Sequence, residues 1–308
     1  MKWTIHRLQV TFEKSGLRLD QYLAQSSIEL SRTQAKKIID LGGVHINGRR
    51  VRSCSATTSG GDLVEVYIDQ LPLDPYRLSE QDIVFQDQYI IVINKPALVD
   101  TQPTHARFKG TLFEALQWHL KDPFRPHLKA HIGMVQRLDR GTSGLIVFSI
   151  HPRAHKGMTR IFLEHEIKKD YLALVQGVPE QNKGEIRSLL GRSRKENRVK
   201  SVAKGGKEAI TKYQVLEDLT NYSLLNVEIL TGRSHQIRAH MSEQNCPLVG
   251  DVRYGGRSSA VEMQILRPLL HAEKLAFRHP VLNKDLDFIA PVPEDMQNVI
   301  NELRKSIP

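Results

Sequence analysis

The sequence predicts an α+β fold in which helices flank a largely antiparallel, mixed sheet, preceded by a small α/β module. Two observations support this. From residue 82 onwards, short runs of β-branched and aromatic residues alternate irregularly with a few helical patterns, without a regular strand–helix rhythm. Residues 16–68 form a separate pattern that ends before a proline-containing stretch at 69–80. We therefore expect a module at 16–68, a linker at 69–80 and a larger domain at 81–308.

The predicted module begins with a short helix at residues 18–23. Ser31, followed three positions later by Gln34, has the pattern of a capping box that opens a second helix, and Gly42-Gly43 is a stop signal for it. The apolar side chains of this helix share one face and the basic ones share the other: Ala35, Ile38 and Ile39 against Arg32, Lys36 and Lys37.

Short strands are expected to complete the module. Residues 44–51 predict two strands joined by an Asn47-Gly48 turn, and Gly60-Gly61-Asp62 leads into a further strand at 63–68. The hairpin also carries Arg49 and Arg50. A basic helix face beside this hairpin is either a surface for an RNA backbone or a solvated face without a partner.

In the larger domain, residues 83–85 and 89–93 predict two strands, and Pro96 should end the second. Later strands are expected at 145–149, 171–175, 209–217, 224–230 and 288–289, and the clearest helices at 111–120 and 154–166.

Charge is the most informative feature of the composition. Forty-four Lys and Arg residues oppose 34 Asp and Glu, which gives a net charge of +10 and favours a polyanionic partner. Cys54 and Cys246 are far apart and form neither a disulfide framework nor a zinc-binding pattern. No apolar run approaches the length of a membrane helix, and the N-terminus lacks a signal-peptide pattern. We expect a cytoplasmic protein that has no membrane contact.

One polar loop stands out before the predicted strand at 145–149. It reads Arg137-Leu138-Asp139-Arg140-Gly141-Thr142-Ser143-Gly144. Positive charge on both sides of Asp139 would keep its carboxyl ionised. Local chemistry alone favours an ion-paired turn over an active site.

The loop resembles the signature of the RluA-type pseudouridine synthases, which is usually His-Arg-Leu-Asp followed by Thr-Ser-Gly. Gln136 stands where the family has histidine. Other blocks agree in the expected order: Asn94-Lys95-Pro96, the tyrosine-bearing strand 167–175, the arginine block 230–240, the segment 247–256 and Leu270-His271-Ala272. Residues 16–68 resemble the alpha-L RNA-binding module of a small-subunit ribosomal protein.

The resemblance implies the pseudouridine synthase fold, a catalytic domain at 81–308 and the isomerisation of uridine in structured RNA. Asp139 would act at the ribose, either by attacking it or by assisting proton abstraction, because a carboxylate can stabilise positive character at the anomeric carbon. Arg233 would pair with Asp139 and keep it ionised. Tyr171 would lie under the uracil ring and act as the general base that removes the proton from carbon 5.

RNA contacts are expected on several elements. The resemblance gives Arg137 the role of entering the space that a flipped nucleotide leaves. Gln136 cannot stack as an imidazole does, so it puts this step in doubt. Phosphate contacts are expected at the module residues Arg32, Lys36, Lys37, Arg49 and Arg50, and at Arg192 and Arg194 of a cationic stretch that is otherwise a solvated loop.

We expect no cofactor, no nucleotide cofactor and no metal, since His119, His127 and His131 lack an acidic or cysteine ligand set. The chain is expected to be a monomer. The combination of module and domain favours large-subunit ribosomal RNA as the substrate, and transfer RNA is the alternative. A ribosome assembly factor without catalysis and a nucleoside glycosidase are rival functions.

Overall fold

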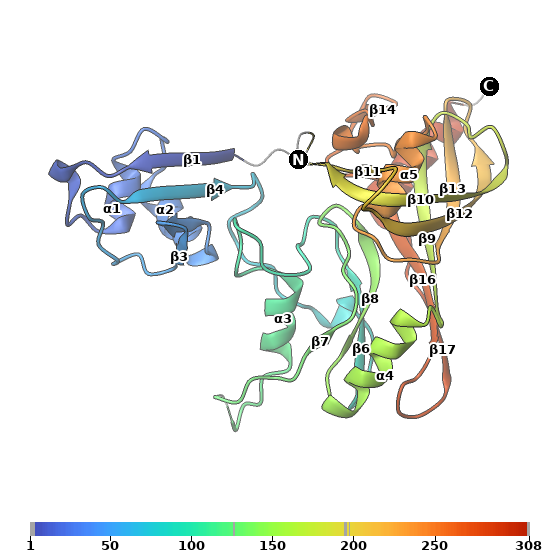
Figure 1. Cartoon of the computed structure of the whole chain (residues 1–308), viewed down its shortest axis with the longest axis horizontal. Coiled ribbons are helices and arrows are strands. Elements are labelled where there is room, and N and C mark those ends of the chain that lie inside the picture. The colour runs from blue at the N-terminus through green and yellow to red at the C-terminus, as the bar shows by residue number, and fades with distance from the viewer. Residues whose placement is uncertain (1–3, 126, 194–195, 197, 307–308) are drawn as a thin grey trace. The chain divides into compact units, whose positions relative to one another are not determined.

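The structure is a computed structural model that describes residues 4–125, 127–193, 196 and 198–306. The chain divides into two compact units: residues 1–78 with 99–127, and residues 79–98 with 128–308 (Figure 1). The division predicted from the sequence places 99–127 in the larger domain and ends the linker at residue 80. It does not anticipate that the chain returns to the first unit after residue 98.

The first unit contains a four-stranded antiparallel sheet with two helices on it. Its strands are β1 (Thr4–Gln9), β4 (Leu63–Ile68), β2 (Val44–Ile46) and β3 (Arg49–Val51), in that order. The short helix η1 (Phe12–Lys14) and the helices α1 (Leu19–Ala24) and α2 (Arg32–Leu41) complete the module. Apolar side chains of both α-helices and the sheet form one core.

The capping residues of α2 behave as the sequence predicts. The Ser31 side chain accepts a hydrogen bond from the Gln34 backbone, and the Gln34 side chain accepts one from the Ser31 backbone. Gly42 ends the helix at a φ of 93°, a conformation that favours glycine. Ala35, Ile38 and Ile39 are buried and Arg32, Lys36 and Lys37 are exposed, which confirms the predicted faces.

The segment 99–127 belongs to this first unit and carries α3 (Leu112–His119), which Thr111 caps. The guanidinium of Arg107 donates to both carboxylate oxygens of Asp69, at 2.6 and 3.0 Å, and both side chains are buried. The Phe108 backbone donates to Leu41 O at 2.6 Å, and the Arg52 guanidinium lies 4.2 Å from the centre of the Phe108 ring. The segment is therefore fastened to the module by a buried ion pair and by backbone hydrogen bonds.

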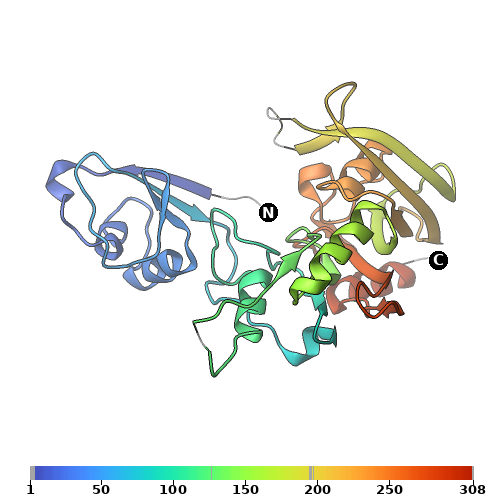
Figure 2. The ribbon, with the colours of Figure 1, turned by 60° about the horizontal axis from the view of Figure 1, so that its bottom comes forward.

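The second unit is built on one mixed sheet, as predicted. Its main path is β11-β10-β12-β13-β9-β16-β8-β6-β5, with β17 paired to β16 and β7 paired to β8. All of these pairs are antiparallel except β16 with β8. Figure 2 shows β10 and β12, in yellow, at one edge of the sheet. The bounds of these strands are β5 (Ile83–Gln86), β6 (Ile90–Lys95), β7 (Gly133–Met134), β8 (Ser143–Ser149), β9 (Ile167–Gln176), β10 (Lys183–Ser193), β11 (Arg198–Ser201), β12 (Lys207–Asp218), β13 (Tyr222–Ile229), β16 (Leu270–Arg278) and β17 (Asp285–Ile289).

Helices cover the sheet on both faces. The cluster around α4 (Pro152–Leu163) contains Ile167 of β9, whereas the cluster around α6 (Glu294–Lys305) contains Leu172 and Leu174 of the same strand. Because successive side chains of a strand point to opposite faces, the residues at 167, 169 and 171 share the α4 face. A third helix, α5 (Gln236–Glu243), follows β13. The remaining elements are η2 (Glu80–Asp82), η3 (Val252–Tyr254), β14 (Ser259–Ala260) and β15 (Met263–Gln264).

Within the described residues, no helix combines the length and apolar character needed to cross a membrane.

Candidate active site

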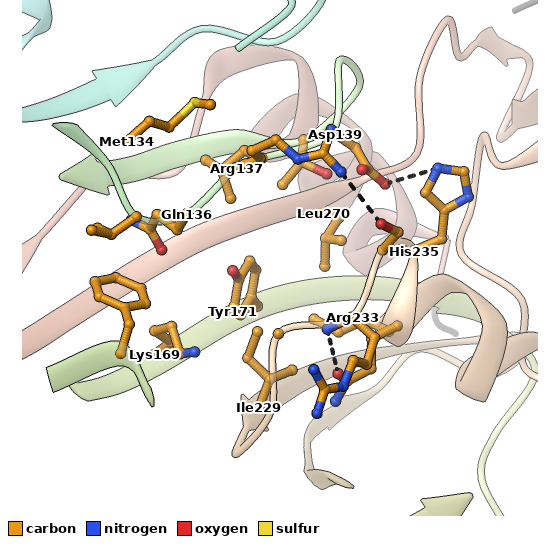
Figure 3. A pocket seen from close by; sticks show the side chains of 18 of the residues that line it. Met134, Gln136, Arg137, Asp139, Lys169, Tyr171, Ile229, Arg233, His235 and Leu270 are labelled. Atoms are coloured by element: carbon orange, nitrogen blue, oxygen red, sulfur yellow. Dashed lines mark hydrogen bonds and ion pairs between the residues drawn. The ribbon is translucent and has the colours of Figure 1, made fainter. Parts of the chain in front are cut away.

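A cavity of about 650 Å³ opens on the α4 face of the second unit's sheet. Asp139 lines it from the loop between β7 and β8, Tyr171 and Lys169 from β9, and His235 and Arg238 from the start of α5. Figure 3 shows Tyr171 and Lys169 together on the strand, with Asp139 and Arg137 on the loop across the cavity. The structure thus brings Asp139 and Tyr171 into one cavity, although they are far apart in the sequence.

The loop that carries Asp139 is fixed at its C-terminal end by close packing. Gly144 has a φ of 108°, and a Cβ at this position would lie 2.3 Å from the Ala272 carbonyl oxygen. Only glycine therefore allows β8 to pair in parallel with β16 here. The buried Ser143 hydroxyl lies 3.0 Å from Nδ1 of His271, which anchors the same turn. These contacts explain the Ser-Gly part of the motif as support for the loop that carries Asp139.

Arg238, not Arg233, is the arginine that binds Asp139. Nη1 of Arg238 donates to Oδ2 of Asp139 at 3.0 Å. Nε of Arg233 instead donates to the Glu208 carbonyl oxygen at 2.8 Å. The prediction that Arg233 pairs with Asp139 is therefore wrong, although Arg233 also lines the cavity. The turn before α5 brings the later arginine of the block to the carboxylate.

Asp251 and Tyr254 hold the Arg238 side chain in place. Nε and Nη2 of Arg238 donate to the two carboxylate oxygens of Asp251, at 2.6 and 2.9 Å. The Tyr254 ring lies 4.9 Å from the guanidinium carbon. Only Nη1 is left to reach Asp139, so the guanidinium presents a single, oriented donor to that carboxylate.

His235 is a second neighbour of Asp139, which sequence reasoning missed. It caps α5 in the left-handed conformation, with a φ of 54°, and its Nε2 lies 3.7 Å from Oδ2 of Asp139. The Tyr254 oxygen lies 3.0 Å from Nδ1 of His235 and accepts a hydrogen bond from the Val199 backbone. In the part of the chain that the structure describes, the Tyr254 hydroxyl hydrogen has no acceptor other than Nδ1. When this hydroxyl donates to Nδ1, a neutral imidazole carries its proton on Nε2, facing Asp139.

These neighbours decide the charge of Asp139. Burial alone would raise the pKa of its carboxyl, but His235, Arg238 and Arg137 outweigh this effect and hold the pKa below its usual range. Burial lowers the pKa of His235, whereas Arg238 supplies a permanent positive charge beside Asp139. Asp139 is thus an ionised carboxylate in a cavity that is partly closed to water.

The Tyr171 ring forms part of the cavity wall. It is 7% exposed, and Ile229 and Leu270 line the cavity beside it (Figure 3). Burial and the nearby Asp139 charge raise the pKa of its phenol well above the usual value. Tyr171 is therefore a neutral ring suited to stacking. Its hydroxyl can accept a proton only if it gives up its phenolic proton in the same step.

Gln136 and Arg137 lie at the cavity rim. Arg137 is exposed, and its Nη2 donates to the Ser234 hydroxyl at 3.3 Å (Figure 3). The Gln136 amide nitrogen is buried and has no hydrogen-bond partner in the described part of the chain. Gln136 thus keeps a donor available at the position where the RluA-type signature has histidine.

The predicted RNA-contact residues fall into different environments. Arg32 and Lys36 lie 2.9 and 3.9 Å from the buried carboxylate of Asp20, and Lys37 lies 2.9 Å from Asp74. Arg50 donates to the Thr104 carbonyl oxygen and so helps to hold the segment 99–127. Arg49, on β3, and Arg192, on β10, have exposed side chains, and Arg194 lies outside the described residues.

The cavity thus combines an ionised carboxylate, a fixed arginine and a buried tyrosine on one face of the mixed sheet. A family model described as RNA pseudouridylate synthase matches residues 89–243, and one described as the S4 domain matches residues 17–64. The chain belongs to the RNA pseudouridylate synthase family, with an S4 domain in front. It is an isomerase that converts uridine in RNA to pseudouridine, and the predicted resemblance is confirmed.

Individual relatives agree over nearly the whole chain. A Bacillus subtilis protein named "Uncharacterized RNA pseudouridine synthase YlyB" is 32% identical over 96% of this chain and 96% of its own. A Zymomonas mobilis protein named "Ribosomal large subunit pseudouridine synthase D" is 35% identical over 94% of this chain and 95% of its own. The solved structure titled "Human RNA Pseudouridylate Synthase Domain Containing 4" matches 73% of this chain and 93% of its own with a TM-score of 0.59 at 22% identity, which shows the shared fold.

Proposed function

We propose that this enzyme isomerises uridine in large-subunit ribosomal RNA. The single observation that supports the chemistry is the Asp139 carboxylate, which Arg238 holds ionised beside Tyr171 in one cavity. Relatives from Zymomonas mobilis and Vibrio cholerae are named "Ribosomal large subunit pseudouridine synthase D" and match 94% of this chain. The net charge of +10 and the S4 domain fit a folded RNA as substrate.

In the proposed reaction, Asp139 acts where the bond between the base and the ribose breaks. Positive character develops at the anomeric carbon, and the carboxylate either bonds to it or takes a proton from the sugar. Arg238 and His235 orient the carboxylate and keep it ionised before the bond breaks. Tyr171 stacks on the uracil ring. In the last step, its hydroxyl receives the proton of carbon 5 and releases its phenolic proton.

Residues outside the chemistry deliver the RNA. We assign binding to the module at 16–68, through Arg32, Lys36, Lys37, Arg49 and Arg50, and further phosphate contacts to Arg192 and Arg194. Arg137 is exposed at the cavity rim, which suits a side chain that enters the helix when a nucleotide leaves it. The proposed enzyme works in the cytoplasm as a monomer, without a cofactor or metal.

Mapping of pseudouridines tests the substrate. Ribosomal and transfer RNA are compared from cells that lack the protein and are complemented with the wild type or with Asp139→Asn. We expect one or more large-subunit sites to be lost and then restored by the wild type only. Loss of sites in transfer RNA alone would contradict the proposed substrate, and restoration by Asp139→Asn would contradict the role of Asp139.

A further inference from the structure

Lys169 is a buried cation that has no anionic partner among the residues that the structure describes. Its side chain projects from β9 into the cavity, and the residue is 7% exposed. Among the described residues, no hydrogen bond or ion pair reaches its ammonium group, and the Phe162 ring lies 5.5 Å from Nζ. The neighbouring Lys168, on the opposite face of the strand, is exposed and pairs with Asp170 at 3.6 Å. Lys169 is therefore the lysine of this pair that faces the substrate cavity.

The other cations of the cavity are already engaged. Arg238 binds both Asp139 and Asp251, and Arg233 binds the Glu208 carbonyl oxygen. Arg137 donates to Ser234 at the rim. Lys169 therefore supplies this wall of the cavity with a positive charge that can bind a group of the RNA substrate.

Burying the Lys169 ammonium group costs free energy unless a bound ligand interacts with its charge. Burial of a charged group without a partner opposes its ionisation, and burial lowers the pKa of Lys169 to about 8. The contact with Phe162 offsets part of this penalty. If Lys169 had a purely structural role, only its methylene groups would be needed, and the methionine of Lys169→Met would replace them.

The reaction creates the charge that fits this ammonium. When the bond between N1 and C1′ breaks, its electron pair stays on N1, and uracil leaves as an anion whose charge spreads over N1, O2 and O4. Carbon 5 then bonds to C1′, loses its proton, and N1 gains one, so no co-reactant is needed. Between the two bond changes, the cavity must hold a free, turning anion.

We propose that the Lys169 ammonium group binds a carbonyl oxygen of the detached uracil and holds the anion against Tyr171 while it turns. The inference rests on the proposed position of the base over Tyr171. Residues 169 and 171 lie on the same face of β9, about 7 Å apart along the strand, so an extended lysine reaches the edge of a base stacked on the ring. Because neutral uridine carries no such charge, the contact strengthens as the bond breaks and favours the transition state over the bound substrate.

Single-turnover kinetics on a defined RNA substrate test the proposal. We expect Lys169→Met to lower kcat by about 100-fold with little change in KM, because the lost contact forms in the transition state. Lys169→Arg, which keeps a positive charge, should retain much of the rate. Lys168→Met is the matched control, on the opposite face of the same strand, and should behave as the wild type.

The pH profile supplies a readout that a structural role would not move. The ammonium is charged below its pKa, so the wild-type kcat should fall as the pH rises through about 8. In Lys169→Arg this fall should disappear, because a guanidinium keeps its proton. The other charged or titratable groups that line the cavity are unchanged in this variant, so loss of the fall in kcat at high pH identifies Lys169 as its source. These unchanged groups are His155, His165, Tyr171, Asp139, His235, Arg137, Arg233 and Arg238.

Rescue by an added amine completes the test. Lys169→Ala leaves space where ethylammonium can bind, and added ethylamine should restore part of kcat to this variant and leave Lys168→Ala unaffected. Wild-type kcat in Lys169→Met, or a folded Lys169→Ala enzyme that ethylamine does not rescue, would overturn the proposal. Activity in Asp139→Asn would instead contradict the proposed role of Asp139 and is scored separately.

Discussion

Asp251 and Arg238 form a two-point ion pair, with Nε–Oδ2 and Nη2–Oδ1 distances of 2.6 and 2.9 Å, which leaves the third guanidinium nitrogen for Asp139. Asp251 does not bond to Asp139 itself. Its part is to fix the direction from which the arginine approaches the carboxylate. The geometry of the reacting group therefore depends on a residue more than 100 positions further along the chain.

Replacing Asp251 tests this dependence. Asp251→Asn keeps one acceptor but loses the charge and one of the two bonds, so we expect Arg238 to shift and kcat to fall by about 100-fold. Stopped-flow or quench-flow kinetics measure kcat, and thermal melting reports folding. Glu217→Gln, which breaks a remote ion pair with Arg304, is the control and should leave kcat unchanged. Wild-type kcat in Asp251→Asn would show that Asp251 does not orient the arginine.

A second prediction separates the two arginines of the block. Arg238→Lys should reduce kcat by about 1,000-fold, because a lysine cannot make the three directed bonds that reach Asp251 and Asp139. Arg233→Lys should cost less than about tenfold, because Arg233 bonds to a backbone carbonyl. A larger loss in Arg233→Lys than in Arg238→Lys would restore the role first assigned to Arg233.

The third prediction concerns the hydroxyl of Tyr254. Tyr254→Phe keeps the ring under Arg238 but removes the hydroxyl that lies 3.0 Å from Nδ1 of His235. We expect kcat to fall by about tenfold, equivalent to one hydrogen bond of about 1.4 kcal/mol, with KM unchanged. Tyr213→Phe removes a hydroxyl elsewhere in the same sheet and serves as the control. An unchanged kcat in Tyr254→Phe would mean that His235 does not need this partner.

The fourth prediction is about stability. Arg107 and Asp69 are both buried, so Arg107→Ala removes the charged partner of a buried carboxylate and should lower the free energy of unfolding of the first unit by about 3–5 kcal/mol. Arg7→Ala, which breaks the exposed pair with Glu65, should cost less than about 1 kcal/mol. Urea denaturation followed by tryptophan fluorescence measures both, since Trp118 lies in this unit. Equal effects of the two variants would contradict a structural role for the buried pair.

Contiguous motifs were the part of the site that the sequence could predict. The Asp139 loop and the strand of Tyr171 are short segments whose order and residue types resemble a known family, and both line the cavity. The choice between Arg233 and Arg238 depended on how the chain turns at His235, where a left-handed residue starts α5. Nothing in the spacing of the block reveals this turn.

Lys169 and Lys168 illustrate a second limit. They are adjacent and identical, and only the burial of each strand face distinguishes the cavity lysine from the surface one. In the fold, the capped helix α2 and the strands with strong apolar patterns were predicted close to their observed bounds. The strands β10 and β16 and the helix α6 were not predicted, although α6 has a clear apolar face, Met296, Val299, Ile300 and Leu303, in the core.

Because residues 99–127 belong to the first unit, the RNA-binding module cannot be exchanged as one continuous segment. The chain passes between the units at residues 78–79, 98–99 and 127–128. Cutting it once at residue 78 would leave Arg107 without Asp69 and expose the side of Phe108 that packs on the module. A chimaeric enzyme that exchanges this module for another therefore has three joints to match rather than one.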